Sequence, residues 1–214
     1  MNWLGLYFSS LLAALLAILP IVNPFGAVPL VMSASGHLPE QERLRQIRRA
    51  CVYTFFLMSG FLVAGGLIMN FFGISLPGMR IAGGLIVAFL GFQMLFPNPI
   101  SDKEAMTKAA GESYDIAFTP LAMPGLSGPG TFAVVMSLSS QAAARKGYLS
   151  IVDFMGVLTA ILLTALLSWF VLRGAERVNR LLGATGMVAL TRLTGFLMIS
   201  LGVQLSLIHL SEPT

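Results

Sequence analysis

The chain has 214 residues, of which 56% are hydrophobic and 10% charged, with a formal net charge of +4. This composition excludes a water-soluble domain and is typical of an integral membrane protein. The basic residues lie at the ends of apolar runs and belong to no nucleic-acid reading module, which excludes nucleic acid as a partner.

Six apolar runs are each long enough to cross a hydrocarbon core about 30 Å thick. They predict an all-α, polytopic membrane protein with six transmembrane helices. The runs cover approximately residues 3–33, 51–72, 76–96, 116–141, 148–172 and 186–209.

The first run contains Pro20, Pro24 and Pro29. As one straight helix of about 30 residues it would measure about 45 Å and overshoot the membrane. Each proline also removes a backbone donor, and Asn23 before Pro24 is a typical helix start. We predict a break near residues 20–24, with a second half-helix that starts at Asn23–Pro24 and continues toward Ser33.

The fourth run carries a proline ladder at the same spacing, because Pro120, Pro124 and Pro129 each follow a proline of the first run by 100 residues. The third and sixth runs share Arg-x-x-Gly and Gly-x-Gln, at Arg80 to Gln93 and Arg192 to Gln204. We therefore predict two related halves.

The predicted halves are residues 1–96 and 115–210, joined by a polar linker at 97–114. Because each half has three spans, the second enters the membrane inverted relative to the first. Inverted three-helix repeats with broken first and fourth helices are typical of secondary transporters.

Basic residues are concentrated in the connections that follow runs one, three and five. The positive-inside rule places these connections in the cytoplasm and both termini in the periplasm. These connections hold nine basic residues: Arg43, Arg45, Arg48, Arg49, Lys103, Lys108, Arg173, Arg177 and Arg180. The opposite side of the membrane has only three, which are Arg80, Arg145 and Lys146.

The two breaks predict a binding site for a small solute. Half-helix starts would direct amides at a carboxylate, and carbonyls freed around Pro20 and Pro120 would receive an ammonium or a sodium ion. The alternative is that prolines only kink the helices and glycines only let them pack closely. The predicted substrate-binding residues are Asn23, Pro24, Gly26, Pro29, Gln93, Pro120, Pro124, Gly125, Ser127, Gly128, Pro129, Gly130, Thr131 and Gln204.

Several polar residues have structural alternatives. Asn23, Ser127 and Thr131 could cap helices, and Gln93 and Gln204 could bond neighbouring helices. Asp153, the only acidic residue inside a run, is either a proton-coupling group or an interface partner of Arg145 and Lys146.

No catalytic residue, cofactor or metal site is predicted. His37 lies in a loop and in no metal-ligand pattern, and no nucleophile, Walker or dinucleotide motif is present. The single cysteine, Cys51, lies in an apolar run and is expected to serve packing. The last residues, 206–214, look foreign to the rest of the chain, so His209 is given no role.

Three motifs carry a family resemblance, at residues 23–29, 73–84 and 120–131. Through them the sequence resembles the MarC family of bacterial membrane proteins, over nearly the whole chain up to about Leu205. The resemblance implies a multi-pass protein of the bacterial inner (plasma) membrane, related to lysine-exporter-like transporters. It also implies small neutral amino acids as the substrate class.

These observations predict a secondary transporter for neutral amino acids or related zwitterions, with rocking of one repeat against the other. The alternative is a non-transporting membrane protein with a structural or stress-response partner role, and a narrow channel is a third. The predicted partners are the lipid bilayer and a small solute; a coupling ion (sodium or proton) and a homo-oligomer are left open.

Overall fold

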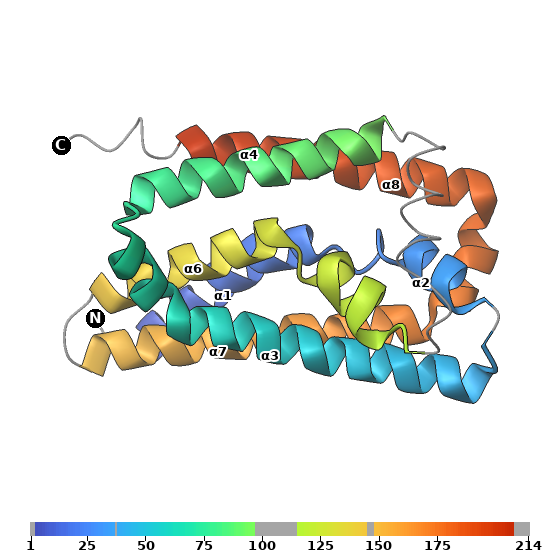
Figure 1. Cartoon of the computed structure of the whole chain (residues 1–214), viewed down its shortest axis with the longest axis horizontal. Coiled ribbons are helices and arrows are strands. Elements are labelled where there is room, and N and C mark those ends of the chain that lie inside the picture. The colour runs from blue at the N-terminus through green and yellow to red at the C-terminus, as the bar shows by residue number, and fades with distance from the viewer. Residues whose placement is uncertain (1–2, 37, 97–114, 145–147, 208–214) are drawn as a thin grey trace.

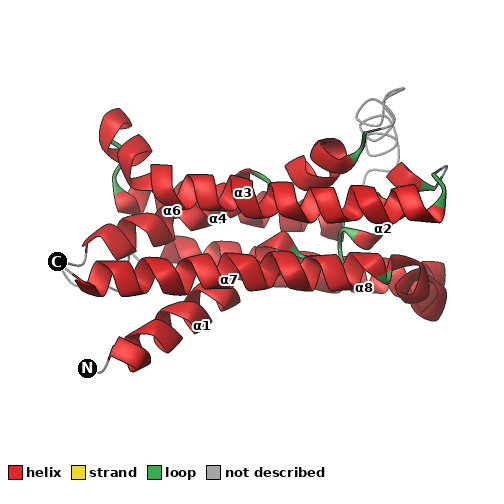
Figure 2. Cartoon of the chain, turned by 90° about the horizontal axis from the view of Figure 1, so that it is seen from below, coloured by secondary structure: helices red, strands yellow, loops and turns green. Residues whose placement is uncertain are grey.

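The computed structural model describes residues 3–36, 38–96, 115–144 and 148–207, and their regular structure is helical throughout (Figure 2). The predicted linker at 97–114 lies outside the described residues. The helices are α1 (Trp3–Val22), α2 (Val28–Ser35), α3 (Glu40–Phe72), α4 (Leu76–Leu95), η1 (Ala117–Leu126), α6 (Pro129–Ala144), α7 (Tyr148–Arg173) and α8 (Ala175–Leu207).

Within the described residues, five helices are long and apolar enough to cross a membrane: α1, α3, and most of α4, α7 and α8. Large apolar side chains cover their outer faces, as on α3, where Leu67 is 72% and Phe71 83% exposed. The expectation of an all-α polytopic membrane protein is confirmed. The fourth expected run is not one spanning helix, because it divides into η1 and α6.

The predicted break in the first run is present, but its second half-helix starts later than expected. Asn23 has a left-handed backbone, with a φ of 45°, and its amide donates to the carbonyl of Leu19 at 3.0 Å. A residue before proline is disfavoured in the right-handed helix, and asparagine tolerates the left-handed region. Asn23 therefore ends α1, and α2 starts at Val28 with Pro29 in its first turn.

The second break is built differently. Thr119 and Met123, each directly before a proline, have extended backbones inside η1, with φ values of −120° and −132°. This is the conformation that proline favours in the preceding residue. Wide turns form around them, closed by amides that bond carbonyls five residues back, as from Ser127 to Ala122 at 2.8 Å. A regular helix resumes at Pro129.

The helices form three layers in Figure 1. The outer layers are the pair α4 and α8 and the pair α3 and α7, and α1 and α6 lie between them. The strongest contacts join helices from distant parts of the sequence: α1 packs on α7, α3 on η1, α6 and α7, and α4 on α8 and α6.

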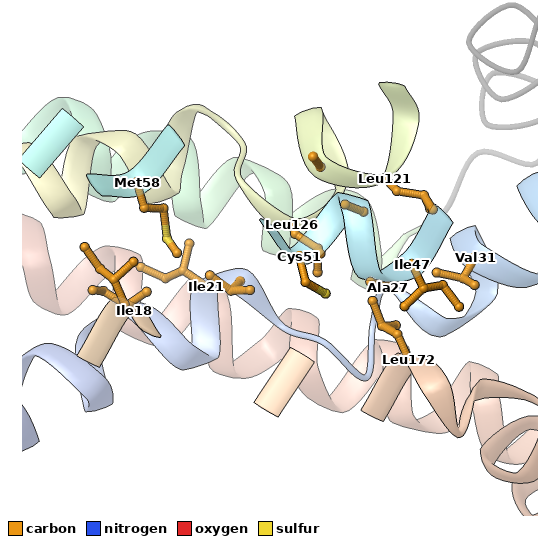
Figure 3. Close-up of a cluster of buried hydrophobic side chains, with 14 of the residues drawn as sticks. Ile18, Ile21, Ala27, Val31, Ile47, Cys51, Met58, Leu121, Leu126 and Leu172 are labelled. Atoms are coloured by element: carbon orange, nitrogen blue, oxygen red, sulfur yellow. The ribbon is translucent and has the colours of Figure 1, made fainter. Parts of the chain in front are cut away.

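A buried apolar cluster holds the broken segments in place (Figure 3). Ile18 of α1, Val31 of α2 and Leu121 of η1 are at most 1% exposed and belong to this one cluster. Cys51 of α3 is 5% exposed within it, which confirms the predicted packing role. Much of the unwound backbone is therefore packed against protein, as an interrupted helix requires in a membrane, while Phe25 and Phe118 at the two breaks are each 46% exposed.

The described basic residues of α3 and α8, except Arg192 in the middle of α8, gather at one end of the bundle. Arg43 at the start of α3 bonds Glu176 at the start of α8, at 2.6 Å. Arg177 and Arg180 follow on the same short stretch, which is set off from the rest of α8 by Gly183, where φ is 61°. This end lies on the right of Figure 1, opposite the N-terminus.

Four glycines let α4 and α8 approach closely. A Cβ placed on Gly202 would lie 2.4 Å from the carbonyl oxygen of Gly84, and one on Gly195 would lie 2.7 Å from that of Gly91. The two contacts are seven residues apart on both helices. Small residues that let backbones meet are a common basis for helix association in membranes.

We expect Gly202→Ala to destabilise the protein by roughly 1–3 kcal/mol, because the new methyl group meets backbone that can yield only if the helices separate. The matched control is Gly60→Ala on α3, where a Cβ would meet nothing within 4 Å. There alanine should be neutral or stabilising, because it favours helix more than glycine does. Thermal unfolding in detergent measures both, and equal stability of the two variants would contradict the proposed close packing.

Candidate functional site

A cavity of about 440 Å³ lies where the two broken segments face the pair of α4 and α8. The break between α1 and α2 forms one wall, the junction of η1 and α6 a second, and α4 with α8 the third. The lining residues are Ile21, Val22, Asn23, Gly26, Ala27, Pro29, Leu30, Leu90, Gln93, Met94, Gly125, Leu126, Gly128, Thr131, Thr191 and Met198.

Asn23 is fixed at the first wall by its own turn. Its side-chain Oδ1 accepts a hydrogen bond from the amide of Gly26 at 3.0 Å, and its Nδ2 lies 3.8 Å from the sulfur of Met94. The amides of Ala27 and Val28 donate to carbonyls within the same turn. The start of α2 therefore has little amide capacity left for a ligand.

The second wall is the start of α6. The first intrahelical bond there runs from the amide of Phe132 to the carbonyl of Gly128, at 3.2 Å. The amides of Gly130 and Thr131 belong to the first turn and have no carbonyl partner within the helix. Thr131, which is 2% exposed, lines the cavity beside them. This helix start therefore favours a negatively charged or strongly polar ligand group.

The third wall is mostly apolar. Leu90 and Met94 from α4 and Met198 from α8 line it, with the polar groups of Gln93 and Thr191. The Thr191 hydroxyl donates to the carbonyl of Met187 at 2.8 Å. None of the described residues around the cavity is charged. The arrangement thus combines a polar end at α6 with an apolar surface opposite, and it provides no fixed charge to hold an ion alone.

The MarC family, described as integral membrane proteins, matches the chain over residues 8–212. The chain belongs to the MarC family. A MarC-family relative from Citrobacter koseri, named UPF0056 inner membrane protein MarC, is 42% identical, with 92% of each chain covered. Proteins of the same name from Escherichia coli O1:K1 and Escherichia coli K12 are 41% identical at the same coverage. No solved structure matches the chain.

The family match extends past Leu205, where the sequence analysis placed the limit of the likeness. Nothing in these comparisons points to an enzyme. Within the described ranges, no group of three or more His, Cys, Asp or Glu side chains could hold a metal ion.

Half of the predicted site residues of this MarC-family protein line the cavity. These are Asn23, Gly26, Pro29, Gln93, Gly125, Gly128 and Thr131. Among the described side chains, those that do not line it are Pro24, Pro120, Ser127, Pro129, Gly130 and Gln204, and the side chain of Pro124 lies outside the described ones.

The residues outside the cavity have other surroundings. Ser127 is fully buried, and its hydroxyl donates to the carbonyl of Ala122 at 2.8 Å, which is the capping type of role. Gly130 faces Val87 of α4, whose Cγ2 would lie 3.0 Å from an added Cβ. Gln204 is exposed on α8.

The apolar wall of the cavity and Thr191 were not among the site residues predicted from the sequence. Leu90, Met94 and Met198 resemble the lipid-facing residues beside them, so no pattern distinguishes them. One feature of the sequence could have pointed to two of these residues, because they lie next to the motif that the third and sixth runs share. Met94 directly follows Gln93, at the end of the motif in the third run, and Thr191 directly precedes Arg192, at its start in the sixth. Only the packing of α4 on α8 brings these positions to one wall.

We expect Asn23→Ala to lower stability by about 1–2 kcal/mol, because alanine is strained in the left-handed conformation. Asn23→Gly should cost less, since glycine adopts this conformation freely. Thermal unfolding of the purified variants compares them. Equal losses would mean that the hydrogen bond to Gly26, and not the backbone conformation, accounts for the contribution of Asn23.

Proposed function

We propose that this protein is a secondary transporter of small neutral amino acids or related zwitterions. The observation that carries the proposal is the uncharged cavity between two interrupted helices, with the start of α6 at one side and an apolar wall opposite. A zwitterion of this class has a carboxylate that could bind at the start of α6 and a side chain that could contact the apolar wall. A cavity of this volume falls in the range usual for small-molecule sites.

Recognition would divide among three groups of residues. The amide of Thr131 would bind the carboxylate, together with the Thr131 hydroxyl. The side-chain oxygen of Gln93 and a carbonyl left without its helical partner by Pro24 would accept from the ammonium group. Leu90, Met94 and Met198 would contact an apolar side chain, so bulkier residues there would favour smaller substrates.

The helix contacts support an inverted repeat of residues 1–96 and 115–210. In such a repeat, α1 with α2 corresponds to η1 with α6, α3 to α7, and α4 to α8. A two-fold axis then requires that the contact of α1 with α7 be matched by one of α3 with η1 and α6, and both are present. It also requires α3 to meet α7, and α4 to meet α8, as they do.

The distribution of charge supports an orientation. Arg43, Arg49, Arg177 and Arg180 lie on the helices whose ends meet through the bond of Arg43 to Glu176. We place this end in the cytoplasm and both termini in the periplasm. The relatives' name, inner membrane protein, supports the bacterial inner membrane as the location.

The same contacts argue against rocking of one repeat on the other, because the repeats are interlaced. The pair of α4 and α8 is joined by close backbone contacts at two points, whereas toward the broken segments it faces the cavity and packs on α6 where Gly83 meets Ala133. We propose that this pair moves as a unit against the remaining helices, and that this movement opens the cavity alternately to the two sides.

A neutral amino acid should raise the midpoint of thermal unfolding of the detergent-purified protein. At ten times its Kd the shift should be about 3–6 °C. Asn23→Gly and Thr131→Val should reduce the shift. Thr164→Val on α7 is the control, because Thr164 is also buried and its hydroxyl donates to the carbonyl of Ala160, away from the cavity. The absence of any shift across a panel of neutral amino acids would favour the partner-protein alternative.

Disulfide cross-linking tests the proposed movement in a Cys51→Ala background, which removes the only native cysteine. Cysteines at Gly83 and Ala133 would join α4 to α6, where a Cβ on Gly83 lies 2.7 Å from that of Ala133. This cross-link should stop flux into proteoliposomes, and reduction should restore it.

The control cross-link joins α6 to α3 instead, through cysteines at Gly65 and Met136, where the two Cβ positions are 3.3 Å apart. Both pairs need only small shifts to reach disulfide geometry. The control should leave flux intact, because both helices belong to the same unit. Flux through the cross-linked α4 and α6 would contradict the proposed movement, whereas absence of flux in the uncross-linked background would count against transport itself.

A further inference from the structure

A groove of about 380 Å³ lies between α3 and α7 on the outer face of the bundle. Two small residues, Cys51 and Ala165, form its floor, and each is only 5% exposed. Larger apolar side chains that are partly or largely exposed form its walls: Val52, Phe55, Phe56, Leu162, Leu166 and Trp169. Because small residues lie beneath and large ones beside them, this part of the lipid-facing surface is hollowed.

One end of the groove is basic. Among the described residues that line it, Arg48 alone is charged. Arg48 lies at the same end as Trp169, because α3 begins and α7 ends on the right of Figure 1. One turn after Trp169, the guanidinium of Arg173 lies over the indole ring, 5.3 Å from its centroid. Trp169 is therefore a common neighbour that places one arginine from each helix at this end of the groove.

These two arginines differ from the basic residues around them in having no acidic partner. Arg43, Arg45 and Arg49 each bond a carboxylate, at 2.6, 3.7 and 3.8 Å. Within the described ranges, Arg48 and Arg173 have no such ion pair. No described residue therefore neutralises the positive charge at the basic end of the groove.

The arginines also lie at the depth of lipid headgroups. The 33 residues of α3 measure about 50 Å as an α-helix, which exceeds a hydrocarbon core of about 30 Å. Its residues 50–72 carry no charge and alone measure about 34 Å. Arg48 therefore lies at the edge of the core, and Arg173, the last residue of α7, lies beside it across the groove. Basic residues and tryptophan at this depth are typical of the membrane interface.

We propose that this groove binds an anionic phospholipid, with Arg48 and Arg173 at the phosphate and one acyl chain along the groove. Guanidinium groups match the geometry of phosphate and bind it through paired hydrogen bonds. From Arg48 to Phe56 the groove follows α3 for about 12 Å, which accommodates the part of a chain nearest the headgroup. A zwitterionic headgroup fits less well, because no carboxylate among the described lining residues could bind its ammonium group.

A lipid in this groove would hold α3 against α7. Cys51 on the groove floor belongs to the apolar cluster that packs around the broken segments. A lipid that binds only the folded protein should therefore stabilise it. This inference does not depend on the proposed transport, because it rests only on the charge, shape and depth of the groove.

The test compares phosphatidylglycerol with phosphatidylethanolamine, both with oleoyl chains, added to the delipidated full-length protein in detergent. Native mass spectrometry counts bound lipids, and thermal unfolding measures stabilisation. One phosphatidylglycerol per chain should bind roughly 5–25-fold more tightly than phosphatidylethanolamine, because each basic residue near an anionic headgroup contributes about fivefold. Equal binding of the two lipids would overturn the proposal, as would equal stabilisation by inorganic phosphate alone.

A pair of double variants tests the two arginines. Arg48→Gln combined with Arg173→Gln should weaken phosphatidylglycerol binding roughly 25-fold and remove the preference. The matched control is Arg45→Gln combined with Arg180→Gln, which removes the same charge from the same end of the bundle but not from the groove. The control should bind like the wild type. An equal loss in both double variants would mean a general effect of charge and would overturn the proposed site.

A third comparison tests the acyl chain. Ala165→Leu keeps both arginines but fills the groove floor, so it should weaken phosphatidylglycerol binding severalfold. Ala82→Leu adds the same bulk at an exposed position of α4 and should have no effect. Unfolding without lipid checks that both variants are folded. Unchanged binding in Ala165→Leu would overturn the proposal, as would lipid-free dimers in the mass spectra of the wild type that the groove substitution dissociates, since a second copy would then cover the groove.

Discussion

The constraint on which this structure depends is the need to shelter two stretches of non-helical backbone in an apolar surrounding. Free amides and carbonyls cannot face lipid, so each break must be enclosed by other helices. The chain meets this requirement by placing α1 and α6 between α4 with α8 and α3 with α7, and by packing α2 on α8 and η1 on α3. The apolar cluster around Ile18, Val31 and Leu121 completes the enclosure. Where the enclosure is incomplete, it leaves the larger cavity.

Close backbone contact within one pair of helices gives the molecule a natural division. Gly84 and Gly91 on α4 meet Gly202 and Gly195 on α8, so this pair is joined by backbone and not by long side chains. Against the rest of the molecule the pair presents larger residues such as Leu90 and Met198, which line the cavity. A site that lies between two separately packed units is one that their relative movement can open and close, which connects the packing to the proposed function.

The two cavities differ in chemistry. The larger one has no charged lining among the described residues and combines an α6 start with an apolar wall, as a zwitterion would require. A second cavity, of about 250 Å³, lies beside Asp153, whose Oδ1 accepts a hydrogen bond from the Ser10 hydroxyl. Arg145 and Lys146, which the sequence analysis considered as partners of Asp153, lie outside the described residues. The helices α1 and α6 contribute to the walls of both cavities.

The sequence by itself determined the membrane class, the helical runs and the presence of two breaks, because apolar run length and proline position act locally. It also identified Asn23, Gln93 and Thr131, since polar residues beside proline and glycine stand out in an apolar chain. Only the tertiary structure decided that Asn23 ends α1, that η1 has extended residues and that Gln204 lies outside the cavity. The third wall and the surroundings of Asp153 could not be predicted either, because they depend on which helices pack together. Which helices pack together depends on contacts between residues that are far apart in the sequence. A local sequence pattern contains no information about such contacts.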